Sequence, residues 1–338
     1  MMQRASVLEM VFSYVRRMTK HPTKLFPAHQ PQSLDRTTAD LVFQKNPKNY
    51  VVSQKTDGLY SYLVIGTLSI DNNNVLFCCT VGRNELVEYF SIKCSNKYFS
   101  GTLIVGEIIE KKFIAFDCFS MAGENQISNS YIERLKSVSK IQDDMSMGFF
   151  SIHGMEVLVK PVYLISDFVS NFRSISEDDG LIFMPVDDLL TKALPFKWKQ
   201  KNTIDLLINA SFDQNGVNGW TYVIVQPRGI SNVTLVTNCN MIETLESLLN
   251  TNRQTFNYRV IFECLLLLSV ESTVVQYHAI PVKTRSDKKN PNLLATIRGT
   301  MDSVISNITD TEIVGWMLQA ASKPADLCET ADLCETLI

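Results

Sequence analysis

The sequence predicts an α+β fold in two parts, and three observations support this prediction. The chain has 338 residues, which is enough for about two domains with a core each. Up to residue 203, apolar runs separated by turn residues alternate with helical patterns. From Asn202 onward five strand-like runs follow one another, with one helical run, Met241 to Leu249, among them.

The composition is that of an ordinary soluble globular protein. Hydrophobic residues make up 45% of the chain, charged residues 20%, and the net charge is −3. This balance excludes a broad basic coat for nucleic acid, so any nucleic-acid contact must be local. The eight cysteines form no CxxC pair and the four histidines are scattered, which argues against a zinc cluster and a disulfide framework. A reducing, intracellular compartment is therefore expected.

No segment predicts membrane association. Glu9 interrupts the only apolar run near the N-terminus, so the pattern of a secretory signal is missing. The longest apolar stretch, Val260 to Val270, contains Glu263 and is too short to span a bilayer.

The elements of the first part follow from apolar spacing. Residues 2–18 predict a packing helix, with a targeting helix as the alternative that Glu9 and the few basic residues disfavour. Apolar runs on both sides of Lys55-Thr56-Asp57-Gly58 predict a strand, a tight turn and a second strand, with Gly58 supplying the backbone freedom of the turn. We further expect a hairpin turn at 71–74, strands at 103–109, 113–117 and 156–159, helices at 128–147 and 162–172, and an acidic turn leading into a buried strand over 176–185.

Lys55 is the first candidate for chemistry. The pattern holds one lysine at a strand end beside a carboxylate, and a lysine near other cations can act as a nucleophile. A surface lysine before a hairpin turn would show the same tetrapeptide, so the tetrapeptide alone does not decide between the two.

Two further side chains stand in apolar strands. Glu107 lies inside LIVGEII, where a carboxylate either faces a cleft or is badly placed. Phe116 lies in FIAFD and, taken alone, would be a core residue.

The segment PFKWK, residues 195–199, places Phe196 and Trp198 on one face of a strand and Lys197 and Lys199 on the other. Two lysines on the same face repel each other, which favours a bound anion between them. A solvated strand edge is the alternative.

The second part resembles a small barrel of the OB kind, because it contains five short strands. We place it at residues 204–300, after a first domain at 1–203. The charged loop 283–292, KTRSDKKNPN, follows its last strand and is expected to be ordered. A single helix over 301–320 is expected to pack back on the first domain. The tail, 321–338, contains ADLCET twice and is expected to be disordered.

Six segments in order resemble the motifs of the lysine nucleotidyltransferases, and more narrowly of the mRNA guanylyltransferases, the GTP-using capping enzymes. They are KTDG at Lys55, GEI around Glu107, FIAFD ending at Asp117, DGLIFM at Asp179, KWKQKNTIDL from Lys197 and RSDKKNPN from Arg285. The resemblance covers roughly residues 50 to 300 and is nearest to the short stand-alone type of some large DNA viruses. It implies a domain of ATP-grasp-like antiparallel sheets with helices, followed by the OB-fold domain.

Three features favour capping enzymes over ATP-dependent ligases of the same superfamily. Threonine follows the lysine, NTID follows KWK closely, and Pro-Asn follows RSDK. The chain shows neither a cysteine phosphatase signature nor a Gly-rich methyltransferase segment. RNA triphosphatase and cap methyltransferase activities are therefore expected in separate partners, with RNA polymerase as a further partner.

The resemblance implies that Lys55 attacks the α-phosphate of GTP, forms a lysine–GMP phosphoramidate, and passes GMP to the 5′-diphosphate end of RNA. It implies nucleotide contacts from Thr56, Arg83, Glu107, Phe116, Lys160, Lys197, Lys199, Asp205, Arg285, Asp287 and Lys288. Of these, Arg83 and Glu107 would bind the ribose, Phe116 would stack on guanine and Lys160 would read it. Lys197 and Lys199 would hold the α-phosphate.

The resemblance also implies a divalent metal, Mg²⁺ or Mn²⁺, assisted by Asp179. Arg285 and Lys288 would reach the β- and γ-phosphates, with Asp205 and Asp287 ordering them. Because these residues lie on the second domain, closure and reopening of a cleft are expected. The reaction would take place in the nucleus or at a viral or cytoplasmic transcription site.

The chain departs from the family at two positions, and two alternatives stay open. Tyr60 stands where the family often has an arginine, which affects a nucleotide contact, and Gln54 replaces the commoner acidic residue before the lysine. The first alternative is an ATP-dependent RNA or DNA ligase. The second is a catalytically silent scaffold of the same fold that binds RNA or a partner.

Overall fold

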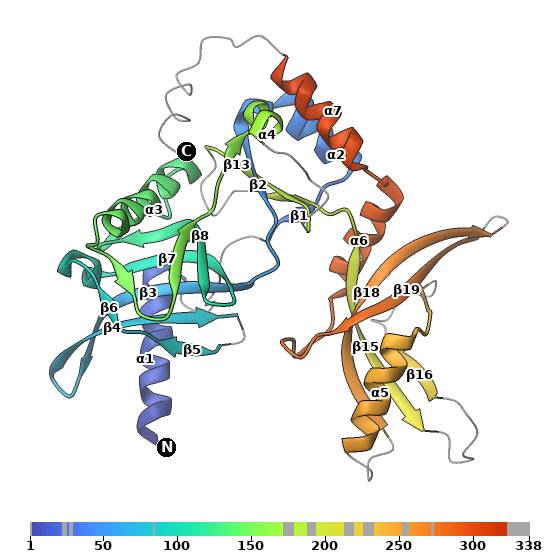
Figure 1. Ribbon diagram of the computed structural model, residues 1–338, viewed down its shortest axis with the longest axis horizontal. Helices are drawn as coiled ribbons and strands as arrows, with labels where there is room; N and C mark the ends of the chain where they lie inside the picture. The colour runs from blue at the N-terminus through green and yellow to red at the C-terminus, as the bar shows by residue number, and fades with distance from the viewer. Residues whose placement is uncertain are drawn as a thin grey trace. The chain divides into compact units, whose positions relative to one another are not determined.

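The computed structural model describes residues 2–21, 26, 30–83, 85–171, 179–187, 194–212, 220–225, 233–251, 257–271 and 274–322. The chain divides into two compact units (Figure 1). The first comprises Met1–Gln32, Thr38–Trp198 and Thr311–Ile338, and the second comprises Ser33–Thr37 and Lys199–Asp310. The architecture is α+β, as the sequence predicts. Among the described residues, no helix has the length and apolar character needed to cross a membrane.

The larger sheet of the first unit has its strands in the order β11-β8-β7-β3-β4-β5, with β9 paired to β8. The strands are β3 (Leu59–Ile70), β4 (Asn73–Gly82), β5 (Val87–Tyr89), β7 (Thr102–Ile109), β8 (Lys112–Met121), β9 (Glu124–Asn125) and β11 (Glu156–Val159). Only the β11–β8 pairing is parallel among the pairings within this sheet. A short ladder of β6 (Ile92–Lys93) and β10 (Ser151–Ile152) accompanies it.

Helices cover both faces of this sheet. Val11 and Val15 of α1 (Met2–Met18) pack in one core cluster with Tyr62 and Val64 of β3. The alternate β3 residues Leu63 and Ile65 pack in another cluster with Val138 and Ile141 of α3 (Tyr131–Ser146). Successive side chains of a strand point to opposite faces, so β3 reads as a continuous apolar run because both faces are covered.

Two local predictions in this unit are confirmed. Asp71 and Asn72, with φ values of 49° and 62°, connect β3 to β4, as expected for a two-residue hairpin turn with positive φ at both positions. The helix expected at 128–147 is α3, and Ser130 caps it in a capping box with Glu133.

The smaller sheet has the order β1-β14-β13-β2-β12. Its strands are β1 (Gln32–Ser33), β2 (Tyr50–Gln54), β12 (Tyr163–Leu164), β13 (Leu181–Pro185) and β14 (Phe196–Trp198). One face buries Phe183, Phe196 and Trp198, with Phe43 packed edge-on against Phe183 at a centroid distance of 5.2 Å. On the other face, Val51 packs in a cluster with Tyr131 and Leu135 of α3.

The expected tight turn between the strands around KTDG is wrong. β2 belongs to the smaller sheet and β3 to the larger one, so Lys55 to Gly58 connect two sheets. Gly58 is also needed for a different reason than expected, since it is not among the glycines with positive φ. A Cβ at this position would lie 2.8 Å from Glu107 Cβ and 2.9 Å from Ile109 Cγ1, so close packing against β7 requires glycine.

Shorter helices complete the fold. They are α2 (Arg36–Ala39), the π-helix Asp40–Lys45, the 3₁₀ helices Pro47–Asn49 and Asn96–Ser100, α4 (Ile165–Asn171) and α7 (Asp310–Ala321). The helix expected at 162–172 is in part wrong, because Tyr163 and Leu164 pair with β2 as a strand before α4 begins.

The second unit contains one five-stranded sheet in the order β16-β15-β18-β19-β17. The strands are β15 (Thr203–Phe212), β16 (Trp220–Val225), β17 (Val233–Leu235), β18 (Asn257–Glu271) and β19 (Val274–Thr284). β17 pairs parallel to β19 and the other pairings are antiparallel. Helices α5 (Cys239–Thr251) and α6 (Leu294–Ser306) pack on its core through Met241, Leu245 and Ile297.

The single helix expected over 301–320 is wrong. Asn307 adopts the left-handed conformation, with φ 43° and ψ 49°, and ends α6, and α7 starts at Asp310. Asparagine tolerates this conformation better than most residues, and it stops the helix although apolar spacing continues beyond it. In the first unit, the ring centroid of Trp316 on α7 lies 5.6 Å from the ring centroid of Phe43. The tail from residue 323 onward lies outside the described residues.

Candidate active site

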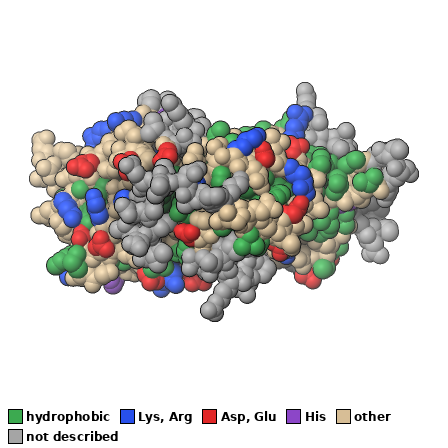
Figure 2. Space-filling view, turned by 90° about the horizontal axis from the view of Figure 1, so that it is seen from above, with side chains coloured by type: hydrophobic (Ala, Val, Ile, Leu, Met, Phe, Trp, Pro, Cys, Tyr) green, Lys and Arg blue, Asp and Glu red, His purple; other side chains and the backbone are tan. Residues whose placement is uncertain are grey.

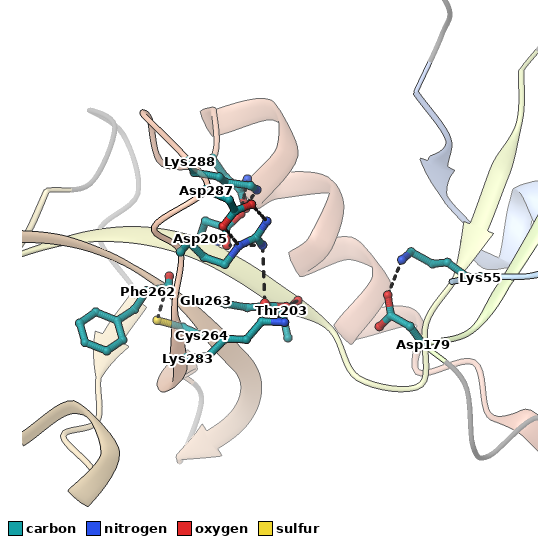
Figure 3. A network of polar contacts seen from close by, with 12 residues as sticks. Lys55, Asp179, Thr203, Asp205, Phe262, Glu263, Cys264, Lys283, Asp287 and Lys288 are labelled. Carbon is teal, nitrogen blue, oxygen red and sulfur yellow. Dashed lines mark hydrogen bonds and ion pairs between the residues drawn. The ribbon is translucent and has the colours of Figure 1, made fainter. Parts of the chain in front are cut away.

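Backbone pairing places Lys55 beside the acidic segment before β13. Gln54 pairs with Leu181, and the Lys55 N–H donates to Gly180 O at 2.8 Å, so the ladder continues one residue past β2. The Lys55 amine forms an ion pair with Asp179 (Figure 3). Both side chains are partly exposed, at 19% and 30%, so the pair stays within reach of a ligand.

Lys197 lies on the same face of the smaller sheet as Lys55. Ser53, Ile182 and Lys197 form one row across β2, β13 and β14. Residues directly opposite each other in antiparallel strands share a face, and so do residues two positions apart. Lys197 is half-buried, whereas Phe196 and Trp198 point to the core, as the sequence predicts. Lys199, the first residue of the longer segment of the second unit, is also half-buried.

Thr56 joins the lysine segment to the larger sheet. Its hydroxyl donates to the Glu107 carboxylate and accepts a hydrogen bond from Lys160 Nζ at 3.0 Å. Lys160 Nζ lies 4.0 Å from Glu107 Oε2, and Lys160 is buried with only 7% exposed. A buried ammonium needs such partners. Glu107 therefore faces a polar group, and the alternative of a badly placed carboxylate is wrong.

Phe116 lies at a bulge next to this group. Val105 pairs with Asp117 and Gly106 with Ala115, which leaves Phe116 as the extra residue on β8. A bulge redirects a side chain, and Phe116 is only partly buried. Lys160 Nζ lies 5.6 Å from the Phe116 ring centroid. The aromatic ring and the cation are thus positioned to meet one ligand together.

Arg83 follows β4 and is exposed. Its guanidinium carbon lies 4.2 Å from the centroid of the Tyr60 ring, within the range of a cation–π contact. Tyr60 pairs with Glu107 across β3 and β7, so Arg83, Tyr60 and Glu107 neighbour one another on the sheet.

Sequence reasoning missed a buried ion pair behind Phe116. Arg134, fully buried on α3, donates from Nε to Asp117 Oδ1 at 2.7 Å and from Nη2 to Oδ2 at 3.1 Å. From the same helix, the Tyr131 hydroxyl donates to Phe116 O at 3.0 Å. The helix therefore fixes the bulged segment. A usable signal existed, because Arg134 lies on the apolar stripe formed by Tyr131, Leu135 and Val138.

The second unit gathers the other candidate residues in one network (Figure 3). Asp205, only 6% exposed, forms an ion pair with Lys288 and another with Arg285 Nη1 at 3.2 Å. Arg285 also holds Asp287 in a two-bond contact, at 2.9 and 2.8 Å. The Asn292 backbone N–H donates to Asp205 O at 2.9 Å. Contacts with Asp205 of β15, and the contact between Arg285 and Asp287 within the loop, therefore order the loop 283–292.

Glu263 belongs to the same network and was not foreseen. Its carboxylate lies 3.3 Å from Lys283 Nζ and 3.5 Å from Arg285 Nη1, and it accepts from Thr203 Oγ1 at 2.8 Å. The hydrogen bonds from Arg285 lower the pKa of Asp287, and the same bonds raise the pKa of Arg285. Asp287 and Arg285 are therefore both charged at neutral pH.

Among the described residues, no group of three or more His, Cys, Asp or Glu side chains could hold a metal ion. Mg²⁺, however, usually binds through one or two carboxylates together with substrate phosphates and water. Asp179, partly exposed beside Lys55, fits that limited role.

Basic and acidic side chains are interspersed on the face that Figure 2 presents.

The family model for the catalytic domain of the mRNA capping enzyme matches residues 3–201. This match covers more than half of the chain and ends at the start of the second unit. The chain therefore belongs to the mRNA capping enzyme family, and it is a nucleotidyltransferase. A comparison with curated proteins finds no match. The likeness to the short viral type stays a prediction.

Proposed function

We propose that the protein is an mRNA guanylyltransferase that transfers GMP from GTP to the 5′-diphosphate end of RNA through a covalent lysine–GMP intermediate. The observation that carries this proposal is the ion pair of Lys55 with Asp179 at the end of β2, on the face that also carries Lys197. A lysine held in this way is ready for attack on phosphorus once its ammonium has released a proton.

In the first step, the Lys55 nitrogen attacks the α-phosphorus of GTP. A P–N bond forms, the bond between the α-phosphorus and the bridging oxygen breaks, and pyrophosphate leaves with the electron pair. Asp179 is the acceptor already hydrogen-bonded to the amine, so it is proposed to receive the proton. Lys197 and Lys199 are proposed to stabilise the charge on the α-phosphate oxygens.

The base and ribose are proposed to bind on the larger sheet. Phe116 offers a partly exposed ring for stacking on guanine, and Lys160 lies beside that ring with Thr56. Glu107 and Arg83 are proposed to meet the ribose. The family's preference for GTP then depends on the contacts of Lys160 and Thr56 with the edge of the base.

The second unit is proposed to be an OB-fold domain that binds the β- and γ-phosphates. Its five strands, open between β16 and β17 in the described pairings, are consistent with a partly open barrel. Arg285 and Lys288 supply the positive charges, and Asp205 and Asp287 hold these two side chains in place. Phosphate oxygens would replace carboxylates as their partners during the first step.

A divalent metal, Mg²⁺ or Mn²⁺, would be held by Asp179 together with nucleotide phosphates, and it would supply charge neutralisation for the phosphoryl oxygens. In the second step, a β-phosphate oxygen of the RNA attacks the guanylate. The P–N bond breaks and Lys55 regains its proton. Separate RNA triphosphatase and methyltransferase activities, and RNA polymerase, are proposed as partners at the site of transcription, in the nucleus or cytoplasm.

The proposal is tested by incubating the full chain with α-labelled GTP and a divalent metal, then denaturing it. We expect acid-labile label on the protein, no label with ATP, and none in Lys55→Ala. Lys45→Ala is the matched control, because Lys45 also pairs with an aspartate, Asp40, at 2.8 Å in the same unit. Labelling with ATP alone would indicate a ligase, and no labelling with any metal would indicate a silent scaffold.

A further inference from the structure

Tyr60 lies between a cation and a carboxylate. Ser61 pairs with Gly82, so Arg83 is the next residue opposite Tyr60 on one side. On the other side Tyr60 pairs directly with Glu107. Opposite residues of antiparallel strands share a face of the sheet, with roughly 5 Å between their Cβ atoms. Arg83 directly after β4, Tyr60 on β3 and Glu107 on β7 therefore stand in one row.

Arg83 is supported by the ring and not by a carboxylate. Its Cζ lies 4.2 Å from the Tyr60 centroid. Within the part of the chain that the structure describes, no carboxylate forms an ion pair with Arg83, and the residue is exposed. The N–H groups of a guanidinium lie in its own plane, so a contact between its face and a ring leaves N–H groups able to donate to an oxygen.

The Tyr60 ring is itself held on three sides. Phe26 and Phe116 lie 5.6 and 5.9 Å away, centroid to centroid, and Tyr62 lies 6.1 Å away. Burial among these groups raises the pKa of Tyr60, so the ring stays neutral at physiological pH. A rigid neutral ring is a suitable platform for a cation.

Removal of the ring would let Arg83 turn toward Glu107. The two residues are two strands apart, roughly 10 Å along the sheet, which an arginine and a glutamate side chain span together. Glu107 already accepts from Thr56 and lies 4.0 Å from Lys160 Nζ, and an ion pair with Arg83 would occupy its remaining acceptor positions. Both would then be unavailable to a nucleotide.

Building on the guanylyltransferase function proposed above, we propose that Tyr60 is a positioning residue for GTP binding. Its ring holds Arg83 and separates it from Glu107, so that the two groups meet the oxygens of the nucleotide independently. Tyr60 thus contributes to nucleotide binding at a position where the family often has an arginine.

The test compares Tyr60→Leu, which keeps bulk without a π face, with Tyr60→Phe, which keeps the ring. Two quantities are measured on the full chain: equilibrium GTP affinity without divalent metal, and the GTP dependence of lysine labelling with metal. We expect Tyr60→Leu to weaken GTP binding about three- to thirty-fold, with little change in the labelling rate at saturating GTP. Tyr60→Phe should bind GTP like the wild type.

Arg83→Leu should weaken binding by a similar factor, and the double variant should lose no more than either single variant. Arg17→Leu is the matched control, because Arg17 lies 4.9 Å over the Tyr14 ring on α1. It should leave GTP binding unchanged. Wild-type affinity in Tyr60→Leu, or losses that add in the double variant, would overturn the inference. If the wild type showed no lysine labelling while Tyr60→Leu and Arg83→Leu still bound GTP more weakly than the wild type, the proposed function would be overturned. The role of Tyr60 in GTP binding would then still hold.

Discussion

Lys55 and Asp179 form an ion pair although 124 residues separate them in the chain. Two backbone features bring them together: the pairing of β2 with β13 and the hydrogen bond from Lys55 N–H to Gly180 O. The proposed nucleophile is therefore positioned by a sheet, and its carboxylate partner comes from the segment directly before the neighbouring strand β13.

The first prediction concerns the charge of Asp179. Asp179→Asn keeps the shape of the side chain but removes the proton acceptor of Lys55. The rate of lysine–GMP formation should fall by about a hundred-fold or more, measured in a single turnover with labelled GTP. Asp40→Asn, which disrupts the exposed pair with Lys45, is the control and should keep the wild-type rate. An unchanged rate in Asp179→Asn would show that the pair is only a structural contact.

The second prediction concerns Gly58. In Gly58→Ala the new Cβ would lie 2.8 Å from Glu107 Cβ and 3.2 Å from Ile108 O, so β7 or the lysine segment must shift. Labelling should fall by about ten-fold or more because misplacement of roughly 1 Å at an active site is costly. Gly315→Ala on α7, where nothing lies within 4 Å of the new Cβ, should keep activity and slightly raise the melting temperature. Normal labelling of Gly58→Ala would contradict the packing argument.

The third prediction concerns the buried pair of Asp117 and Arg134. Arg134→Met leaves the Asp117 carboxylate buried without its cation, which should cost about 3–5 kcal/mol in the free energy of unfolding. Denaturant titration measures this loss. Asp117→Leu combined with Arg134→Met should recover part of it, since no buried charge is then left over. A double variant less stable than Arg134→Met would contradict this explanation.

The fourth prediction concerns the loop of the second unit. Arg285→Ala and Lys288→Ala should each lower the labelling rate by about ten-fold or more if they bind the leaving pyrophosphate. Lys289→Ala, an exposed neighbour, should change the rate little. The RNA-dependent second step, measured on isolated lysine–GMP enzyme, should be less affected, because pyrophosphate has already left. Equal losses in both steps would argue for a structural role.

The fifth prediction concerns acid stability. The hydrogen bond from the Tyr98 hydroxyl lowers the pKa of Asp144, and Lys97 adds to this effect. A carboxyl whose pKa is lower in the folded state adds stability above the ordinary carboxyl pKa and loses it as the pH falls through the folded-state value. Melting temperatures should therefore fall below about pH 4. Asp144→Asn should show a shallower fall than the control Asp143→Asn.

The sequence predicted which segments are strands better than it predicted their partners. Apolar runs identified β2 and β3, but nothing in their pattern shows that they join different sheets. Similarly, Ile305, Ile308 and Ile313 keep apolar spacing through the break at Asn307, where a left-handed residue ends α6. Periodicity reports burial, whereas pairing and helix ends depend on tertiary contacts.

The same limit applies to the candidate site. Motif order was sufficient to select Lys55, Glu107 and Asp179. It did not show that Thr56 connects Glu107 to Lys160, because that contact joins residues 104 positions apart. The partners of such polar groups depend on the register between strands, and this register cannot be read from the sequence alone.

The most direct test of the account is to map the labelled site. The full chain is incubated with GTP and a divalent metal, digested, and its peptides are analysed by mass spectrometry. We predict one guanylate on the peptide that contains Lys55, absent after incubation with ATP. A guanylate on another residue, or one that persists in Lys55→Ala, would contradict it.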